Sequence, residues 1–409
     1  MSYITGLSCA KCGADYSKES RAILCSRDDD GRLDISYDYD KISQILSKKV
    51  IESRRNGVWK YRELLPLEDT ENIISLGEGG TPLLRTKRLH KKICSKFLYL
   101  KNETSNPTAS FKDRVITVGI SKAVEFGYKT VVTASSGNAA ASLASYSASA
   151  GLKCYAFVLE FTSMEKIAQM MLTGAEVIRL RGLEKGEDPT VEMLRRVYKE
   201  YGWYPCPSFG PFNPYQAEGS KTIAYEIIEQ LGWTVPGWVV LPVGAGGLLA
   251  GAWKGFKEYE RLGLVDKKPK MAAVQSAGCA PLVQAFEQNL GPFEIKPWVR
   301  PRSIATGLLD PFPWDGDAAL NAVRESSGIA IAVSDCEISE AQRLLACEEG
   351  IFAEPSGVTS LAGLVKLRRS KVIDADDTVV IGITGSGLKD TSIILKNLKK
   401  PQAIRPSLK

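Results

Sequence analysis

The chain of 409 residues is 44% hydrophobic and 24% charged, which is enough for two core domains and a small additional piece, since domains usually hold about 100–200 residues. Its net charge of +6 comes without an aromatic and basic stripe or a reader motif, so no nucleic-acid partner is expected. No apolar run of roughly 20 residues and no signal peptide are recognised, and an odd number of cysteines, nine, favours reduced thiols; we therefore expect a cytoplasmic protein without a membrane partner.

Residues 1–45 are expected to form a separate extension, because their cysteine spacing matches half of a zinc ribbon. Cys9 and Cys12 form a Cys-x-x-Cys pair, and Cys25 follows at a distance typical of a third thiolate. The fourth ligand would lie near Asp28, whose carboxylate is a poorer match to a structural thiolate site. Two interpretations remain open, a weak or incomplete zinc site on these cysteines and a metal-free relic of one. Catalysis is not expected to depend on either.

Beyond the extension, strand-like and helix-like segments alternate almost to the end of the chain. Short apolar runs bounded by turn residues predict strands, and the stretches between them predict helices. This alternation predicts an α/β fold with parallel sheets that are covered by helices on both faces. The predicted strands lie at residues 97–100, 130–132, 155–159, 176–180, 239–241 and 379–383.

A candidate nucleophile, Lys112, lies in the run from Ser105 to Arg114. A lysine becomes nucleophilic when it is desolvated at a fixed point, because burial lowers the pKa of its amine and allows a Schiff base with a carbonyl. Asn106-Pro107 predicts a turn, Ser110 is suited to cap a helix, and Phe111 would help to exclude water. Most lysines are solvated surface charges, so the run alone does not decide the function.

A serine-rich turn follows the predicted strand 130–132 and opens a helix of small residues that ends at about Ala150. Ser135 or Ser136 at the helix start would leave several backbone N–H groups pointing out of the N-terminus, which suits a carboxylate. An ordinary capped helix is the alternative interpretation. The helical residues expected to pack on a sheet are Ala139, Leu143, Tyr146 and Ala150.

A glycine-rich loop, residues 244–247, follows a buried-strand pattern and leads into a helix that runs through Phe256. Glycines let the backbone wrap closely around an anion, and the helix N-terminus adds a favourable partial charge. The loop therefore has the form of a phosphate cradle. It lacks the Walker lysine and the full dinucleotide spacing, so it does not indicate a nucleotide.

In this order the three motifs resemble the fold-type II pyridoxal-phosphate enzymes, most closely the threonine synthases. The resemblance extends from Glu68 to about Asp390. The segment 57–66 is similar to the one that precedes the core in threonine synthases with an N-terminal extension. The further segments that carry the resemblance are residues 76–83, 213–222 and 384–390.

The resemblance implies two doubly wound open-sheet domains with pyridoxal phosphate in the cleft between them. Residues 46–109 and 217–395 would form the large cofactor-binding domain, and residues 110–216 a small mobile domain. Residues 396–409 would be a basic tail. The family also implies a homodimer that acts on a small amino-acid substrate.

The resemblance further implies a role for each matching residue. Lys112 would bind the aldehyde of pyridoxal phosphate and later shuttle protons, Asn138 would bind the ring oxygen, and Thr384 would face the pyridine nitrogen. The glycine loop would hold the cofactor phosphate, and the start of the small-residue helix would hold the substrate carboxylate. The implied cofactor residues are Lys112, Asn138, Gly244, Ala245, Gly246, Gly247 and Thr384, and the implied substrate residues are Ser135, Ser136 and Gly137.

Residues 354–357 match another family stretch near the cofactor, and an ordinary helix start is an equally good interpretation of them. The implied reaction converts O-phospho-L-homoserine and water to L-threonine and phosphate. The substrate phosphate needs cationic donors of its own. Polar groups frequent in threonine synthases are missing at Ala139, Gln216, Ala245 and residues 304–310, and the candidate compensating cations are Lys166, Lys221 and Arg114.

Two alternatives to a threonine synthase remain. The first is a threonine or serine dehydratase, or another β-eliminating or β-replacing lyase of the same fold. The second is a cofactor-binding relative without catalytic activity, against which the intact Lys112, Asn138 and Thr384 argue.

Overall fold

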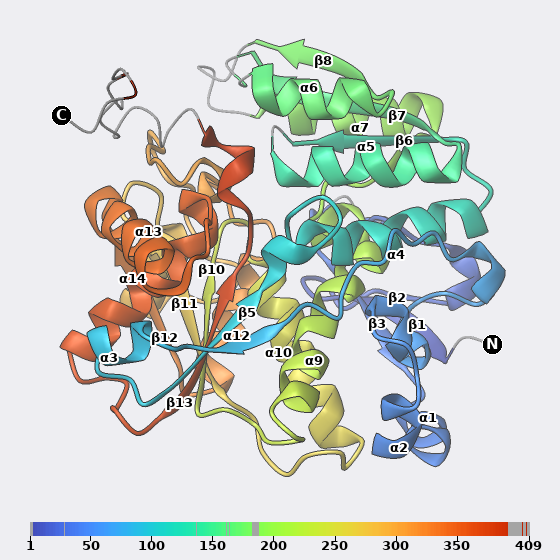
Figure 1. Ribbon diagram of the computed structural model, residues 1–409. Coiled ribbons are helices and arrows are strands. Elements are labelled where there is room, and N and C mark those ends of the chain that lie inside the picture. Colours follow the sequence, from blue (N-terminus) through green and yellow to red (C-terminus); the bar gives the residue numbers. More distant parts are fainter. Residues whose placement is uncertain are drawn as a thin grey trace.

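The computed structural model describes residues 3–391 except 28, 136, 161, 163 and 182–187, together with residues 403 and 406. Two α/β sheets lie next to each other, and a small antiparallel sheet from the start of the chain packs beside them (Figure 1). The predicted α/β fold is confirmed. The expected basic tail falls outside the described residues except for positions 403 and 406.

The strands are β1 (Ile4–Cys9), β2 (Asp15–Tyr16), β3 (Leu33–Tyr37), β4 (Leu83–Arg85), β5 (Phe97–Asn102), β6 (Thr130–Ala134), β7 (Lys153–Leu159), β8 (Glu176–Leu180), β9 (Tyr204–Pro205), β10 (Trp238–Pro242), β11 (Lys270–Ser276), β12 (Ile329–Val333) and β13 (Thr378–Ile383). The helices are α1 (Tyr39–Ile45), α2 (Lys48–Glu52), α3 (Leu89–Lys92), α4 (Lys112–Glu125), α5 (Asn138–Ala150), α6 (Met164–Leu172), α7 (Pro189–Tyr201), α8 (Pro214–Ala217), α9 (Thr222–Gln230), α10 (Gly247–Arg261), α11 (Pro281–Glu287), α12 (Gly316–Glu325), α13 (Asp335–Glu349) and α14 (Pro355–Arg369). Each of the six strands predicted from the sequence lies within an observed one. Across the described ranges, no helix is long and apolar enough to cross a membrane.

The larger sheet has the strand order β12-β11-β10-β13-β5-β4, and every neighbouring pair is parallel except the one that the edge strand β4 makes. Its central strand β10 is buried throughout because helices cover both faces. Successive residues point to opposite faces. Val239 accordingly belongs to the hydrophobic core that contains Phe256 of α10, whereas Val240 belongs to the core that contains Leu361 of α14.

The smaller sheet has the order β8-β7-β6-β9, and all its neighbouring strands are parallel. Helices α5, α6 and α7 accompany it at the top of Figure 1. The face of α5 that was predicted to pack on a sheet is confirmed, since Ala139, Leu143 and Tyr146 are buried, while Ala150 at the helix end is only half-buried. The N-terminal sheet β2-β1-β3 is antiparallel.

Helix α4 is fixed to the larger sheet by a buried ion network around Arg114. Its guanidinium donates to both oxygens of Glu103 at 2.7 and 2.8 Å and to both oxygens of Glu226 at 2.7 Å. Lys101 of β5 donates to Glu226 at 2.6 Å. Burial opposes the charge of Glu226, but Arg114 and Lys101 hold the pKa of this carboxyl well below its usual range. The network therefore ties α4, α9 and β5 together.

We predict that Glu226→Gln destabilises the protein by about 3–5 kcal/mol, because it leaves buried Arg114 and Lys101 without their shared counter-charge. The matched control is Glu192→Gln, which removes an exposed pair with Arg196 and should change the free energy of unfolding by less than about 0.5 kcal/mol. Denaturant unfolding at a fixed cofactor concentration measures both. The depressed pKa also makes the contribution of Glu226 fully present above about pH 4.3 and lost as the pH falls further.

Candidate active site

The first turn of α4 is held against the carboxyl end of β13. Ser110 forms an isolated antiparallel bridge with Gly385, and the N–H of Phe111 donates to the carbonyl oxygen of Thr384 at 3.0 Å. The helix begins at Lys112 with Phe111 as its N-cap. The expectation that Ser110 caps the helix is therefore wrong, and its buried hydroxyl has no hydrogen-bond partner among the described residues. The chain enters the helix through the pairing with β13 instead.

The amine of Lys112 is desolvated. Its Nζ donates to Ser208 Oγ at 2.8 Å and lies 4.7 Å from the centre of the Phe111 ring. Burial lowers the pKa of Lys112 to about 8, while Asp315 and Asp310 oppose that shift. With such a pKa about one amine in ten is neutral at pH 7, compared with roughly one in 2,500 for an ordinary lysine. Lys112 thus has the environment of a nucleophilic amine.

Ser208 is a site residue that the sequence analysis missed. It lies in a loop between β9 and α8 and has a φ of 69°, in the left-handed region that a serine rarely adopts. The proline and glycine residues of this loop, Pro207 and Gly210, indicate a turn, but they do not reveal what the turn contacts. Strained backbone of this kind costs about 1–3 kcal/mol and gathers at functional sites.

Asn138 and Thr384 meet at the start of α14. Asn138 Nδ2 donates to Glu354 Oε1 at 2.6 Å, and the N–H of Glu354 donates to the carbonyl oxygen of Gly385 at 3.0 Å. Glu354 is the N-cap of α14, yet its side chain caps no backbone group there. Residues 354–357 therefore form a helix start whose acidic side chain contacts Asn138 instead. The buried hydroxyl of Thr384 has no partner in the described part of the chain.

The start of α5 differs from the expectation. Gly137, and neither of the two serines before it, is the N-cap. The N–H of Gly137 donates to Ser135 Oγ at 3.3 Å, so Ser135 and Gly137 do lie together beside Asn138. Ser136 lies outside the described residues.

The glycine loop approaches its neighbours more closely than side chains allow. Gly246 has a φ of 106°, and a Cβ there would lie 2.8 Å from the carbonyl oxygen of Asp315. A Cβ on Gly247 would lie 2.8 Å from Asp315 Oδ2, an oxygen for which the described residues offer no hydrogen-bond partner. The N–H groups of Gly244, Ala245 and Gly246 likewise find no acceptor in that part of the chain. They are free to bind an anion.

The family model for pyridoxal-phosphate dependent enzymes matches residues 74–385. This chain belongs to that family. A threonine synthase of Methanocaldococcus jannaschii is 43% identical over 96% of this chain and 95% of the relative. One of Methanosarcina acetivorans is 41% identical over 97% and 95% of the two chains. The chain is thus a fold-type II pyridoxal-phosphate enzyme of the threonine synthase group.

Solved structures of other pyridoxal-phosphate enzymes have the same fold. Maize serine racemase, 21% identical, aligns with a TM-score of 0.66 over 78% of this chain and 91% of its own. A bacterial-type threonine deaminase from T.th., 27% identical, aligns with a TM-score of 0.62 over 75% and 92%.

Pyridoxal phosphate is the cofactor of this enzyme, and the candidate site fits it in three respects. Lys112 offers a buried amine of low pKa, the glycine loop offers unpaired N–H groups for a phosphate, and Thr384 offers a free hydroxyl. Burial raises the pKa of Asp315 to about 7, with Arg32 opposing, so that this carboxyl can be neutral beside a phosphate. Each of the cofactor residues expected from the sequence is present in a usable environment.

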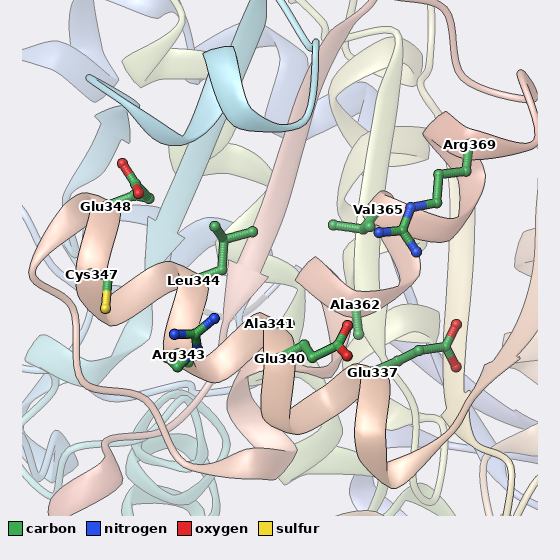
Figure 2. A pocket seen from close by; sticks show the side chains of 10 residues that line it. All are labelled: Glu337, Glu340, Ala341, Arg343, Leu344, Cys347, Glu348, Ala362, Val365 and Arg369. Carbon is green, nitrogen blue, oxygen red and sulfur yellow. The ribbon is translucent and has the colours of Figure 1, made fainter.

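A separate hollow of about 360 Å³ lies between α13 and α14 (Figure 2). Leu344 and Val365 form part of its wall, and charged side chains such as Glu340 and Arg369 surround it. None of the site residues expected from the sequence lines it. It is therefore not the candidate active site.

We predict that attachment of pyridoxal phosphate to the cofactor-free protein follows the pKa of Lys112. The rate should fall about tenfold per pH unit below pH 8 and level off above it, because only the neutral amine reacts. The visible absorbance of the bound cofactor measures this rate, and borohydride reduction followed by peptide mapping identifies the modified residue. Lys112→Ala should attach no cofactor, whereas Lys129→Ala, an exposed lysine, should behave as the wild type.

We also predict that Asp315→Asn shifts this pH profile to lower pH. The Asp315 carboxylate raises the pKa of Lys112, so its removal lets the amine lose its proton more easily. Asp376→Asn changes an exposed carboxylate and serves as the control. An unchanged midpoint in Asp315→Asn would show that burial alone sets the pKa of the amine.

Proposed function

We propose that the enzyme is a threonine synthase that converts O-phospho-L-homoserine and water to L-threonine and phosphate. Its relatives support this, because the likeness to archaeal threonine synthases extends over almost the whole of both chains. The single structural observation that carries the proposal is a cation, Lys166, that remains accessible beside the candidate site. An anionic substrate needs such a group in addition to those that hold the cofactor.

Two of the three cations considered from the sequence are unsuitable for a substrate phosphate. Arg114 is fully buried and bonded to Glu103 and Glu226. Lys221 is also fully buried, and its Nζ donates to Glu218 at 2.6 Å and to Glu258 at 2.9 Å. Because their charges are already matched inside the protein, neither can recruit an anion from solution.

Lys166 has a different environment. It lies on α6 beside the smaller sheet, its side chain is 19% exposed, and its Nζ reaches Thr306 Oγ1 at 3.2 Å and Asp390 Oδ2 at 3.3 Å. Burial raises the pKa of Glu354, and Lys166 and Lys389 oppose this rise, which puts both cations near the contact between Glu354 and Asn138. This side of the site is therefore suited to a second anion.

When bound, pyridoxal phosphate supplies an electron sink that stabilises negative charge on the carbon atoms of the substrate. We propose that Lys112 removes the proton from Cα, because its low pKa leaves part of the amine neutral. Ser135 and Gly137 at the start of α5 would orient the substrate carboxylate. The neutral hydroxyl of Thr384 would face the ring nitrogen, which favours elimination and replacement over transamination.

We further propose that residues 110–216 move as a small domain relative to residues 46–109 and 217–395. Lys166 supports this, since it belongs to the smaller sheet's layer and contacts Thr306 and Asp390 of the other part. Closure would bring its charge to the substrate and exclude water from reactive species. A homodimer in the cytoplasm remains part of this proposal.

The second candidate function is a threonine or serine dehydratase. The same reactive lysine and neutral hydroxyl serve β-elimination, and a threonine deaminase shares the fold at 27% identity. The polar groups missing at Ala139 and Ala245 favour a substrate with fewer charges. The accessible Lys166 argues against it.

The deciding assay presents O-phospho-L-homoserine, threonine and serine in parallel and compares phosphate release with oxo-acid formation. We expect phosphate release together with threonine. Oxo-acid without phosphate would assign the dehydratase function instead. Lys166→Met should raise KM for the phosphorylated substrate at least about tenfold, since a charge-assisted bond contributes roughly 1.5–3 kcal/mol. Lys129→Met removes an exposed lysine elsewhere and should leave KM unchanged.

A further inference from the structure

Four side chains with metal-binding atoms converge in the N-terminal extension. They are Cys9, Cys12, Cys25 and Asp29, and one ligand atom of each lies within 4.8 Å of the others. The sequence directed attention to Asp28 as the fourth member, but that residue lies outside the described part, and Asp29 takes the position. The fourth member is again an oxygen ligand.

The spacing of these atoms fits one tetrahedral metal ion. The sulfurs of Cys12 and Cys25 are 3.6 Å apart, and the sulfur of Cys9 lies 3.7 and 3.8 Å from the two oxygens of Asp29. Metal–sulfur bonds of about 2.3 Å at tetrahedral angles separate two sulfurs by about 3.8 Å. A disulfide would need a separation of about 2.05 Å.

The surroundings hold the four ligands in place. A Cβ on Gly31 would lie 2.3 Å from Cys9 Sγ and 2.8 Å from Asp29 Oδ1, so only glycine fits there. The N–H of Gly31 donates to Asp29 Oδ1 at 2.9 Å, and the hydroxyl of Tyr16 donates to Cys25 Sγ at 3.3 Å. Hydrogen bonds of this kind orient ligands in metal sites.

We propose that Cys9, Cys12, Cys25 and Asp29 bind one zinc ion, and that the ion fixes residues 29–32 as a joint between the extension and the active site. Three thiolates and a carboxylate select a thiophilic divalent ion of tetrahedral preference, which is zinc. Because the protein supplies all four ligands, the site is structural and has no open position for a reaction.

The joint contacts both parts of the enzyme. Asp30 pairs with Arg195 of α7 at 2.8 Å, beside the smaller sheet. Arg32 pairs with Asp317 of α12 at 2.9 Å, beside the larger sheet. The N–H of Ala10, inside the Cys-x-x-Cys turn, donates to the carbonyl oxygen of Arg32 at 2.9 Å. The metal ligands are thus bonded directly to the segment that bridges the two parts.

Arg32 leads from the joint to the cofactor residues. It opposes the raised pKa of Asp315, whose Oδ1 accepts the N–H of Gly210 at 2.8 Å. The loop that contains Gly210 also carries Ser208, the partner of Lys112. Asp315 itself lies against the glycine loop through Gly247. Loss of the metal would free residues 29–32 and alter the charge around Asp315.

The first test measures metal in the full-length cofactor-loaded enzyme by mass spectrometry. We expect about one zinc ion per chain in the wild type and in Cys94→Ser, which changes an exposed cysteine outside the cluster. Cys12→Ser and Asp29→Ala should lose most of it, whereas Asp29→Cys should retain it. Cobalt substitution should give the absorption of a tetrahedral thiolate site. Reduced protein that takes up neither ion would overturn the metal site.

The second test separates the joint from the metal. Arg32→Met should keep its zinc yet bind pyridoxal phosphate about fivefold or more weakly, and Asp29→Ala should weaken it similarly. Cofactor affinity is read from its absorbance on dialysis, so the result does not depend on the substrate and stands apart from the proposed synthase activity. Unchanged cofactor affinity in both variants would overturn the joint, even with zinc bound.

Discussion

The chemistry of this enzyme depends on keeping one amine, that of Lys112, out of water. Burial in the first turn of α4 lowers the pKa of the amine to about 8, and nothing in its own sequence neighbourhood except Phe111 provides that burial. The pairing of Ser110 with Gly385 and the bond from Phe111 to Thr384 bring the helix start to the end of β13. The same pairing that desolvates the lysine therefore also delivers the hydroxyl of Thr384 to the site.

A buried amine needs a rigid helix, and the Arg114 network provides one. Arg114 is only two residues after Lys112, and it is bonded to Glu103 and Glu226 on two other elements. Buried ion pairs add little net stability over apolar packing, but they permit only one arrangement of their partners. The network thus fixes the position of the helix start rather than the strength of the fold. Arg114 is for this reason a structural cation and not a substrate ligand.

The sequence was sufficient to predict what local patterns determine. The apolar runs of the six predicted strands and the glycine loop are local signals, and a family resemblance supplied the roles expected for Lys112, Asn138 and Thr384. Contacts between distant segments left no such signal. Ser208 meets Lys112 across 96 positions, and the choice among Lys166, Lys221 and Arg114 depends on burial and counter-charges that only the fold creates.

The charges in the site show why an anionic cofactor and an anionic substrate can share it. Burial raises the pKa of Asp310 to about 8 and that of Asp315 to about 7, while Lys112 is lowered to about 8. Near neutral pH the two carboxyls can take up protons when an anion approaches, because each is already close to its midpoint. The glycine loop beside Asp315 then presents N–H groups without a fixed opposing charge. An acid-lined cavity can accept a phosphate only in this way, and the accessible cation of Lys166 leaves a second anion site that does not rely on such uptake.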